Sequence, residues 1–358
     1  MGYLTVAARC FSVNKKLIDK LFQKECLSKE ELLSLVGLTE ENEFSYLCEK
    51  ANQKKEEVFG KSVYIRGLIE FTNFCKNDCY YCGIRCSNQK AKRYRLSLDD
   101  ILYSCEIGEK LGIQTYVLQG GEDPFFSDDR LVEMIRKIKE NYPEKAITLS
   151  VGERSLESYE RLKKAGADRY LLRHETATEE HYQKLHPGNL SLEARKICLK
   201  NLKKLGFQTG AGFMVGSPYQ TEEHLVNDLL FLKELQPQMV GIGPFIHHGD
   251  TPFYNYSDGT VRQTILMVAL TRLLLPKALL PSTTALASLH CDGRKLALLS
   301  GANVVMPNLT PPNERKNYLL YQNKIVDGEE TAESFQKLKE EIESIGLTVD
   351  LSRGDYRG

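Results

Sequence analysis

Eight short apolar segments rich in β-branched and aromatic residues recur between residues 61 and 310, and they constrain the fold more than any other feature. They are residues 63–71, 114–120, 146–152, 168–173, 208–216, 239–245, 278–284 and 302–308. Between most of them lie amphipathic stretches of helical period, several of which begin with Ser, Asp or Thr and end with Gly. Strands that alternate with helices in this way run parallel to one another. The sequence therefore predicts an α/β fold.

The number of these units predicts how the sheet is arranged. Eight βα units occupy roughly 250 residues in a closed (β/α)8 barrel, which matches the span from about residue 61 to about residue 310. An open doubly wound sheet is the alternative, but its G-x-G-x-x-G fingerprint follows none of the predicted strands, and residues 210–216 (GAGFMVG) imitate it only weakly. We therefore predict a complete TIM-type barrel, with the chemistry at the C-terminal ends of its strands.

The regions on either side of the barrel have a different pattern. Residues 1–60 are polar, with leucine-spaced segments that predict an N-terminal helical extension. The predicted barrel then occupies residues 61–325. Residues 326–358 contain a charged amphipathic segment (TAESFQKLKEEIESIG) and a polar end, which predict a C-terminal helix and tail with a structural role.

Composition excludes several classes of protein. The chain has 358 residues with 48 basic and 48 acidic side chains, so it lacks the positive field of a nucleic-acid-binding protein. No apolar run approaches the roughly 20 residues of a membrane span, and the N-terminal residues lack the apolar core of a signal peptide. Ten cysteines in such a chain indicate reduced thiols for metal binding or catalysis. We expect a cytoplasmic protein with neither nucleic-acid nor membrane partners.

Three cysteines with the spacing C-x3-C-x2-C directly follow the first predicted strand. They are Cys75, Cys79 and Cys82. Thiolates select iron-sulfur clusters, zinc or Cu(I), and three of them on a cubane leave one iron without a protein ligand. A structural zinc site that recruits Cys86 as a fourth thiolate is the alternative. The remaining cysteines are scattered singly and are expected to be buried free thiols: Cys10, Cys26, Cys48, Cys105, Cys198 and Cys291.

Glycines and charged residues close two other strands. After the second strand come Gln119, Gly120, Gly121 and Glu122. The glycine pair lets the backbone approach a ligand and the carboxylate can accept from an ammonium group, although an ordinary turn is the alternative. In the fourth strand, Arg173 and Glu175 share one face, where they bind a polar ligand or each other. His174 faces the opposite way and is expected to pack structurally.

Hydroxyl groups lie near the ends of further strands. Thr148 belongs to the third strand, and Thr283 and Thr284 to the seventh. Together with an arginine inside the barrel they suggest a small anionic substrate, although they are equally typical of ordinary barrel-layer residues.

The cysteine loop, with Tyr81 directly before its third cysteine, resembles the cluster loop of the radical S-adenosylmethionine (SAM) enzymes. Residues 120–122 resemble their GGE motif, which holds the SAM amino group. The resemblance implies a 4Fe-4S cluster held by Cys75, Cys79 and Cys82, with SAM on the fourth iron and its cleavage to a 5'-deoxyadenosyl radical. Since this superfamily carries its cluster at the first strand end of a large barrel, the resemblance also argues against zinc.

Longer segments narrow the resemblance. Residues 118–124, 168–177, 210–221, 239–252 and 301–308 resemble the HydE family of FeFe-hydrogenase maturases, a relative of biotin synthase and methylornithine synthase. The implied role is to act on a cysteine-bound iron carbonyl cyanide species toward the dithiomethylamine-bridged di-iron unit. The implied partners are other maturases and an electron donor such as a ferredoxin or flavodoxin. A methylornithine synthase-like mutase and a non-catalytic iron-sulfur or zinc scaffold are the alternatives.

The resemblance also implies roles for residues outside the cysteine loop. Glu175 contacts the SAM ribose, Arg195 meets the SAM carboxylate, and the segment from Met239 to Ile242 lies beneath the adenine. With the residues of the two motifs, the implied cofactor-binding set is Tyr81, Gln119, Gly120, Gly121, Glu122, Glu175, Arg195, Met239 and Ile242. The implied substrate set is Thr148, Arg173, Thr283, Thr284, Met306 and Tyr321, with Met239 in its lining. No cysteine follows Cys291, so we expect one cluster and no accessory C-terminal one.

Overall fold

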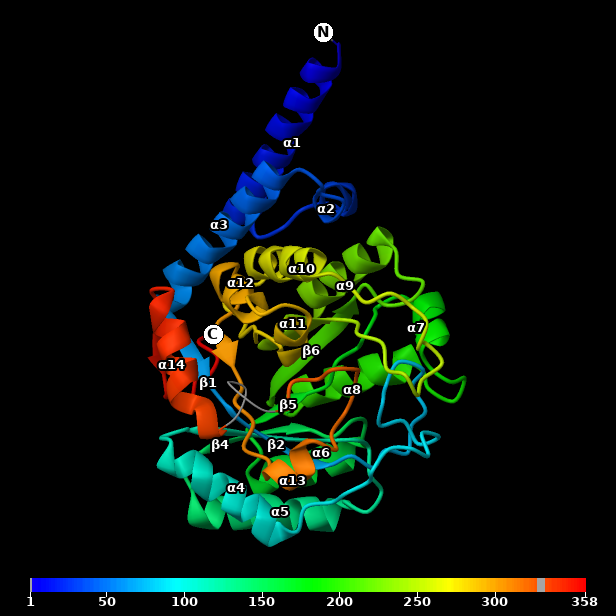
Figure 1. The fold of residues 1–358 in the computed structure, drawn as a ribbon, viewed down its shortest axis with the longest axis vertical. Helices are drawn as coiled ribbons and strands as arrows, with labels where there is room; N and C mark the ends of the chain where they lie inside the picture. The colour runs from blue at the N-terminus through cyan, green and yellow to red at the C-terminus, as the bar shows by residue number, and fades with distance from the viewer. Residues whose placement is uncertain (1, 327–331) are drawn as a thin grey trace.

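Three helices precede the first strand. The computed structural model describes residues 2–326 and 332–358, and these helices are α1 (Gly2–Lys24), α2 (Lys29–Val36) and α3 (Glu41–Phe59). In Figure 1, α1 projects away from the body of the molecule, and α3 lies against the lower part of α1. Ser28 begins α2 with a capping box, in which Ser28 and Glu31 satisfy each other's backbone N–H groups. The helices confirm the helical character predicted for this region, whereas its boundary at residue 60 stays a prediction.

Six parallel strands form the main sheet, in sequence order. They are β2 (Gly67–Thr72), β3 (Thr115–Gly120), β4 (Ala146–Ser150), β5 (Arg169–Leu171), β6 (Gln208–Val215) and β7 (Met239–Pro244). Every neighbouring pair is parallel, as the alternation of strands and helices predicts. The α/β fold with a parallel sheet is therefore confirmed.

Amphipathic helices connect and cover the strands (Figure 1). Six of them are α4 (Leu98–Lys110), α5 (Asp128–Asn141), α6 (Leu156–Ala165), α8 (Leu192–Lys204), α9 (Glu222–Leu235) and α10 (Val261–Leu274). Each of these six begins after a Ser or Thr whose hydroxyl accepts a hydrogen bond from the third backbone N–H of the helix, as predicted for several of them. The other described helices after β2 are α7 (Glu179–Leu185), α11 (Thr284–Leu289), α12 (Gly293–Leu299), α13 (Pro312–Arg315), η2 (Ala332–Ser334) and α14 (Phe335–Ser344). No helix within the described residues is long and apolar enough to cross a membrane.

The first predicted strand is divided in two at Arg66. Its first half, β1 (Ser62–Ile65), pairs with β8 (Val304–Val305) and β9 (Thr348–Asp350) in a separate parallel sheet of order β8-β1-β9. Its second half is β2 of the main sheet. The side chain of Arg66 is buried at the break and donates to the Met239 sulfur and the Gly354 carbonyl.

The prediction of a regular seventh strand at residues 278–284 is wrong. Leu279 forms a single parallel bridge to Met239, and Pro281 forms one to Val304. Pro281 has no N–H to extend a ladder, and helix α11 already begins at Thr284. One further bridge joins Asn308 to Leu68. The described residues thus form two parallel sheets with single bridges between them, rather than one regular eight-stranded sheet.

The C-terminal tail closes the end of the sheet at which the strands begin. Arg169, at the start of β5, is completely buried, and its guanidinium donates to the Asp355 carboxylate (2.7 Å) and the Arg353 carbonyl (2.6 Å). Gln208, at the start of β6, also donates to Asp355 (2.7 Å). These contacts attach the tail to the strands, and its structural role stays a prediction. Strand β9 within it was not predicted.

We expect Asp355→Ala to lower the free energy of unfolding by about 1–2 kcal/mol at pH 7, because it leaves the buried Arg169 guanidinium without its anionic partner. The expected loss is modest because the Asp355 carboxylate is half-exposed and solvent screens its charge. Partial burial alone would raise the pKa of Asp355, but hydrogen bonds from Gln208 and Arg169 outweigh it and lower the pKa. A lowered folded-state pKa stabilises the protein above the unfolded value of about 3.9, and this contribution is lost as the pH falls through the folded-state value.

Urea unfolding of the wild type and of Asp355→Ala, at pH 7 and at lower pH, measures the difference in their free energies of unfolding. Glu343→Ala, at an exposed position near the end of α14, is the matched control and should change little. An Asp355→Ala variant as stable as this control at pH 7 would contradict the assigned role of the tail.

Candidate active site

One cavity of about 290 Å³ lies at the C-terminal ends of the strands of the main sheet. The cysteine loop, the ends of β3 to β7, and Tyr318, Leu320 and Tyr321 line it. In parallel α/β barrels this end carries the ligand-binding loops. The cavity therefore lies where the sequence predicts the chemistry.

Cys75, Cys79 and Cys82 all line the cavity, and all three are partly buried. The Cys82 N–H donates to the Cys79 carbonyl (3.3 Å), which turns the loop tightly between them. Cys86 is exposed and does not line the cavity. Of the four cysteines in this loop, only the first three therefore line the cavity.

Arg93 holds the cysteine loop in place from outside the motif. Its guanidinium donates to backbone carbonyls at the two ends of the loop: Asn73 (2.5 Å), Ile84 (2.8 Å), Arg85 (2.6 Å) and Asn88 (3.3 Å). Charge-assisted hydrogen bonds of this kind are about twice as strong as neutral ones. The sequence analysis missed this residue because nothing distinguishes a lone arginine that follows the motif.

The three thiols suit a cluster better than a single ion. Two thiolates on one zinc lie within about 4.6 Å of each other, since a Zn–S bond is about 2.3 Å long. The three Sγ atoms do not all lie within 4.8 Å of one another. Burial, followed by the charge of Cys75, raises the pKa of the Cys79 thiol to about 12, so this sulfur is a thiolate at neutral pH only when a metal binds it.

Within the described residues, one other group could hold a metal. His290, Cys291 and Asp292 bring three ligand atoms within 4.8 Å of one another, but all three lie exposed on the turn between α11 and α12. Among the other single cysteines, Cys105 and Cys198 are buried as predicted, whereas Cys26 and Cys291 are exposed and Cys48 is partly exposed. The side chain of Cys10 is outside the described part of the structure.

The glycine pair after β3 allows close contact with the cysteine loop. A Cβ atom on Gly121 would lie 2.2 Å from the Phe74 carbonyl oxygen and 2.8 Å from the Cys75 Cβ. Gln119, Gly120, Gly121 and Glu122 all line the cavity. The Glu122 carboxylate accepts from the Glu153 N–H (3.0 Å) and pairs with Lys76 (3.2 Å), so it is held at the cavity wall.

Arg173 and Glu175 both point into the cavity and contact each other. Arg173 Nη2 lies 3.0 Å from Glu175 Oε2, but these atoms are not aligned for a hydrogen bond. Arg173 Nε and Nη2 and Glu175 Oε2 are buried and have no hydrogen-bond partner among the described residues. Glu175 also has a left-handed backbone (φ +64°), which is uncommon for a non-glycine residue and is often found at functional sites. Both charges are therefore available to a polar ligand.

His174 packs on the opposite side of the chain, as predicted. Its ring is completely buried against Phe213 and Phe231, and its Nε2 lies 3.3 Å from the Asp228 carboxylate. Burial lowers the pKa of His174 and raises that of Asp228, so both groups are held toward their neutral forms. Asp228 also accepts from the Ala177 N–H, which fixes the backbone after Glu175.

Arg195 lines the cavity and connects two of its walls. Its Nε forms a hydrogen bond and ion pair with Glu153, and its Nη1 donates to the Arg173 carbonyl (2.8 Å). Burial lowers the pKa of Arg195, but the charges of Tyr182 and Glu153 outweigh it and raise the pKa overall. The guanidinium therefore stays charged at the cavity wall.

The other predicted residues are divided between the cavity and the core. Thr283 and Tyr321 line the cavity, and the buried Thr283 Oγ1 has no partner among the described residues. Thr148, Thr284, Met306 and Ile242 are not among the lining residues. Met239 begins β7 and packs with Met306, Tyr64 and Val304 near the start of the strands. The end of β7 and the residues that follow it, 243–246, line the cavity instead.

His186 is a further neighbour of the motif that the sequence analysis missed. Its buried ring accepts at Nε2 from the Tyr81 hydroxyl (3.1 Å), because Nδ1 donates to the Tyr182 carbonyl (2.9 Å). Burial lowers the pKa of His186 to about 3, so the ring is neutral. A histidine at a helix end far from the motif carries no sequence signal for this contact.

Comparison with known proteins agrees with this site. The radical SAM superfamily pattern matches residues 69–232. The [FeFe] hydrogenase maturase subunit HydE of Thermotoga maritima is 43% identical over 332 residues, which cover 93% of this chain and 94% of that protein. The 3-methylornithine synthase of Methanosarcina acetivorans is 28% identical over 331 residues, which cover 92% of each chain.

Solved structures share the fold. Methylornithine synthase (PylB) aligns with a TM-score of 0.80 and 25% identity over 93% of this chain and 97% of that one. HydG, a maturase of the [FeFe]-hydrogenase, aligns with a TM-score of 0.81 over 95% of this chain and 76% of that one, but at 19% identity it shows the fold alone. With 43% identity to a HydE protein along nearly its whole length, the chain belongs to the HydE family of radical SAM enzymes, whose cofactors are a 4Fe-4S cluster and SAM.

Proposed function

We propose that this chain is a maturase of FeFe hydrogenase that acts on a cysteine-bound iron carbonyl cyanide species, toward the dithiomethylamine-bridged di-iron unit. The observation that carries the proposal is one cavity lined by three partly buried thiols and by the ion pair of Arg173 and Glu175, whose buried atoms lack hydrogen bonds. The identity of 43% to a protein named for hydrogenase maturation supports it.

Cys75, Cys79 and Cys82 hold the cluster in this proposal. When bound and reduced, the cluster supplies the electron that cleaves SAM to a 5'-deoxyadenosyl radical. The protein positions this chemistry and excludes water from it. The neutral His186 fixes the Tyr81 ring beside the third cysteine.

SAM is bound by the cavity wall beside the cysteine loop, which the residues after β3 and β5 and Arg195 form. The backbone of Gly120 and Gly121 and the anchored Glu122 receive its amino group. Glu175 Oε2, which accepts no hydrogen bond from the described residues, accepts from the ribose hydroxyls, and the Arg195 guanidinium meets the SAM carboxylate. The roles of Gln119, Met239 and Ile242 stay predictions.

The substrate lies beside Arg173. Its unpartnered Nε and Nη2 groups suit an anionic group, and the Thr283 hydroxyl faces the same cavity. Tyr321 completes this side of the wall. Thr148, Thr284 and Met306 lie outside the cavity lining, so their predicted roles remain untested.

We also infer that the two sheets act as one closed barrel. Backbone hydrogen bonds run from Val240 to Leu279, from Asn303 to Leu280 and from Leu68 to Pro307. In this arrangement residues 279–281 take the place of the seventh strand between β7 and β8.

Two alternatives remain to be tested against this function. A methylornithine synthase-like mutase is less favoured, because the identity to such a synthase is 28% over nearly the same length. A non-catalytic iron-sulfur or zinc scaffold is less favoured, because the chain belongs to a family of radical SAM enzymes. In the proposed role, other maturases supply the substrate and a ferredoxin or flavodoxin in the cytoplasm supplies the electron.

If three cysteines hold the cluster, only their replacement should cause the protein to lose its iron. Replacing Cys75, Cys79 or Cys82 by Ala should abolish the 4Fe-4S cluster and its spectral response to SAM, whereas Cys86→Ala should retain about four irons per chain. Iron analysis and electron paramagnetic resonance of anaerobically reconstituted protein measure this. Loss of the cluster from Cys86→Ala, or one zinc with no iron in the native protein, would refute the three-cysteine site.

Variants of Glu175 and Arg173 should affect different ligands, SAM for Glu175 and the substrate for Arg173. Glu175→Gln should weaken SAM binding at least tenfold, since a hydrogen bond to a charged group contributes about 1.5–3 kcal/mol. Arg173→Ala should leave SAM cleavage in the absence of substrate nearly intact and abolish turnover. Equal loss of SAM binding and of unfolding free energy in both variants would instead indicate a purely structural ion pair.

The proposed activity predicts functional replacement. Supplied with its cognate partner maturases to a cell-free system that lacks HydE, the protein should restore hydrogen production by FeFe hydrogenase, whereas the Cys75→Ala protein should not. Failure of a well-folded, SAM-cleaving preparation would favour the mutase, which incubation with lysine or ornithine and analysis for a rearranged product would test.

A further inference from the structure

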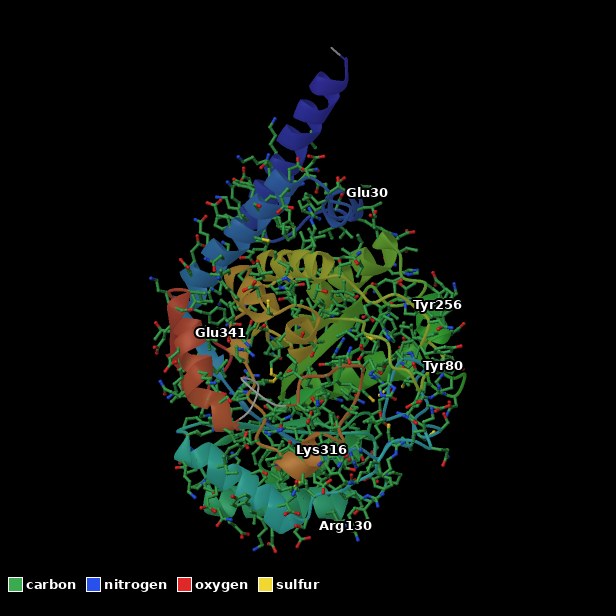
Figure 2. All side chains as sticks on the ribbon, in the orientation of Figure 1. Glu30, Tyr80, Arg130, Tyr256, Lys316 and Glu341 are labelled. Carbon is green, nitrogen blue, oxygen red and sulfur yellow. The ribbon has the colours of Figure 1, made fainter. Side chains whose placement is uncertain are left out.

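A basic hollow of about 160 Å³ lies on the outer side of the cysteine loop. Lys90, Lys92 and Lys316 line it, together with Asn88, Ile84 and Leu319. Lys316 directly follows α13 and is labelled in Figure 2. The hollow is separate from the cavity that holds the cysteines.

The wall between the hollow and the cavity is one layer of protein thick. Ile84, two residues after Cys82, lines both of them. Leu319 lines the hollow, while its neighbours Tyr318 and Leu320 line the cavity. The surface at the hollow is therefore the outer face of the cluster site.

Close backbone packing keeps this wall thin. The Gly83 N–H donates to the Leu320 carbonyl (2.8 Å), and the Asn88 side chain donates to the Gly83 carbonyl (2.7 Å). A Cβ atom at Gly83 would lie 2.2 Å from the Leu319 carbonyl oxygen. A glycine at this position brings the segment after α13 directly onto the cysteine loop.

The hollow carries a positive charge in a chain that is neutral overall. Its lining includes three lysines and one aspartate, a net charge of plus two, whereas the whole chain has 48 basic and 48 acidic residues. Lys90 pairs with Asp250 (2.7 Å). Lys92 and Lys316 are exposed and form no ion pair with any residue in the described part of the chain. The exposed Leu319 supplies an apolar contact between them.

We propose that this basic hollow docks a small acidic electron-carrier protein, which reduces the cluster through the wall formed by Gly83, Ile84 and Leu319. The proposal rests on the proposed function, because it assigns a partner to the same cluster site. The carrier is oxidised by one electron, the cluster is reduced by one, and no bond is formed or broken at this stage. Complementary charge speeds the association of such partners and makes it sensitive to salt.

The test compares two reductants on the reconstituted holoenzyme. With reduced flavodoxin at limiting concentration and low ionic strength, the Lys92→Glu/Lys316→Glu double variant should cleave SAM at least tenfold more slowly than the wild type. With dithionite, which needs no docking surface, both proteins should cleave SAM at the same rate. Added salt should slow the flavodoxin-driven reaction of the wild type and reduce the difference between the two proteins.

Matched variants control for net charge and folding. Lys164→Glu/Lys200→Glu makes the same charge change on the outer helices α6 and α8, at exposed lysines, and should retain the flavodoxin-driven rate. Lys92→Gln/Lys316→Gln, which removes charge without reversing it, should give an intermediate rate.

The outcomes separate the docking surface from the proposed function. An unchanged flavodoxin-driven rate in the Lys92→Glu/Lys316→Glu variant, or equal slowing by the control variant, would overturn the docking surface. An equal loss with dithionite in both charge variants at the hollow would also overturn it, because the lysines would then act on the site itself. A wild-type protein that fails to cleave SAM with dithionite would refute the proposed function instead.

Discussion

The interaction on which the site most depends is the contact of the Arg93 guanidinium with the backbone of the cysteine loop. The loop from residue 73 to residue 88 contains no helix or strand, so its carbonyl groups need donors from elsewhere. Arg93 supplies donors to carbonyls at both ends of the loop and so fixes the distance across it. Three thiols can then face one cavity without any disulfide or secondary structure to hold them.

Charged side chains line the cavity together with the thiols, and only some of them are fully hydrogen-bonded. Arg195 is engaged by Glu153, and Glu122 by Lys76 and a backbone N–H, so these groups are fixed in orientation. Arg173 and Glu175 touch but leave buried atoms without hydrogen bonds, which costs free energy until a ligand supplies the partners. The left-handed backbone of Glu175 adds to this cost. Such a site is stable only because the surrounding structure, including the buried His174 and Asp228, holds it in place.

Residues 318–358 contact both ends of the strand assembly. At the cavity end, the buried Lys324 ammonium pairs with Glu70 of β2 (2.5 Å) and donates to the Tyr318 carbonyl (2.9 Å), which holds residues 318–321 over the cavity. At the opposite end, Asp355 pairs with the buried Arg169. Removing one partner from a buried ion pair leaves an uncompensated charge, so these contacts fix the position of the chain end as well as its stability. The same terminal segment thus forms part of the site and part of the docking surface that we propose.

Local patterns in the sequence determined the elements that depend on residues near one another in the chain. The alternation of apolar segments and capped helices predicts the parallel α/β fold, and the C-x3-C-x2-C spacing with the Gly-Gly-Glu segment predicts which loops line the cavity. Tertiary structure alone decided that residues 278–284 form only single bridges, that residues 348–350 add a strand beside β1, and that Met239 lies near the start of the strands. It also decided which remote side chains serve the site, such as Arg93 and His186. The physical reason is that periodicity and spacing in the sequence encode short-range geometry. The contacts of Arg93 and His186 join groups that are distant along the chain. Their free energy depends on burial and hydrogen bonding that exist only once the chain has folded.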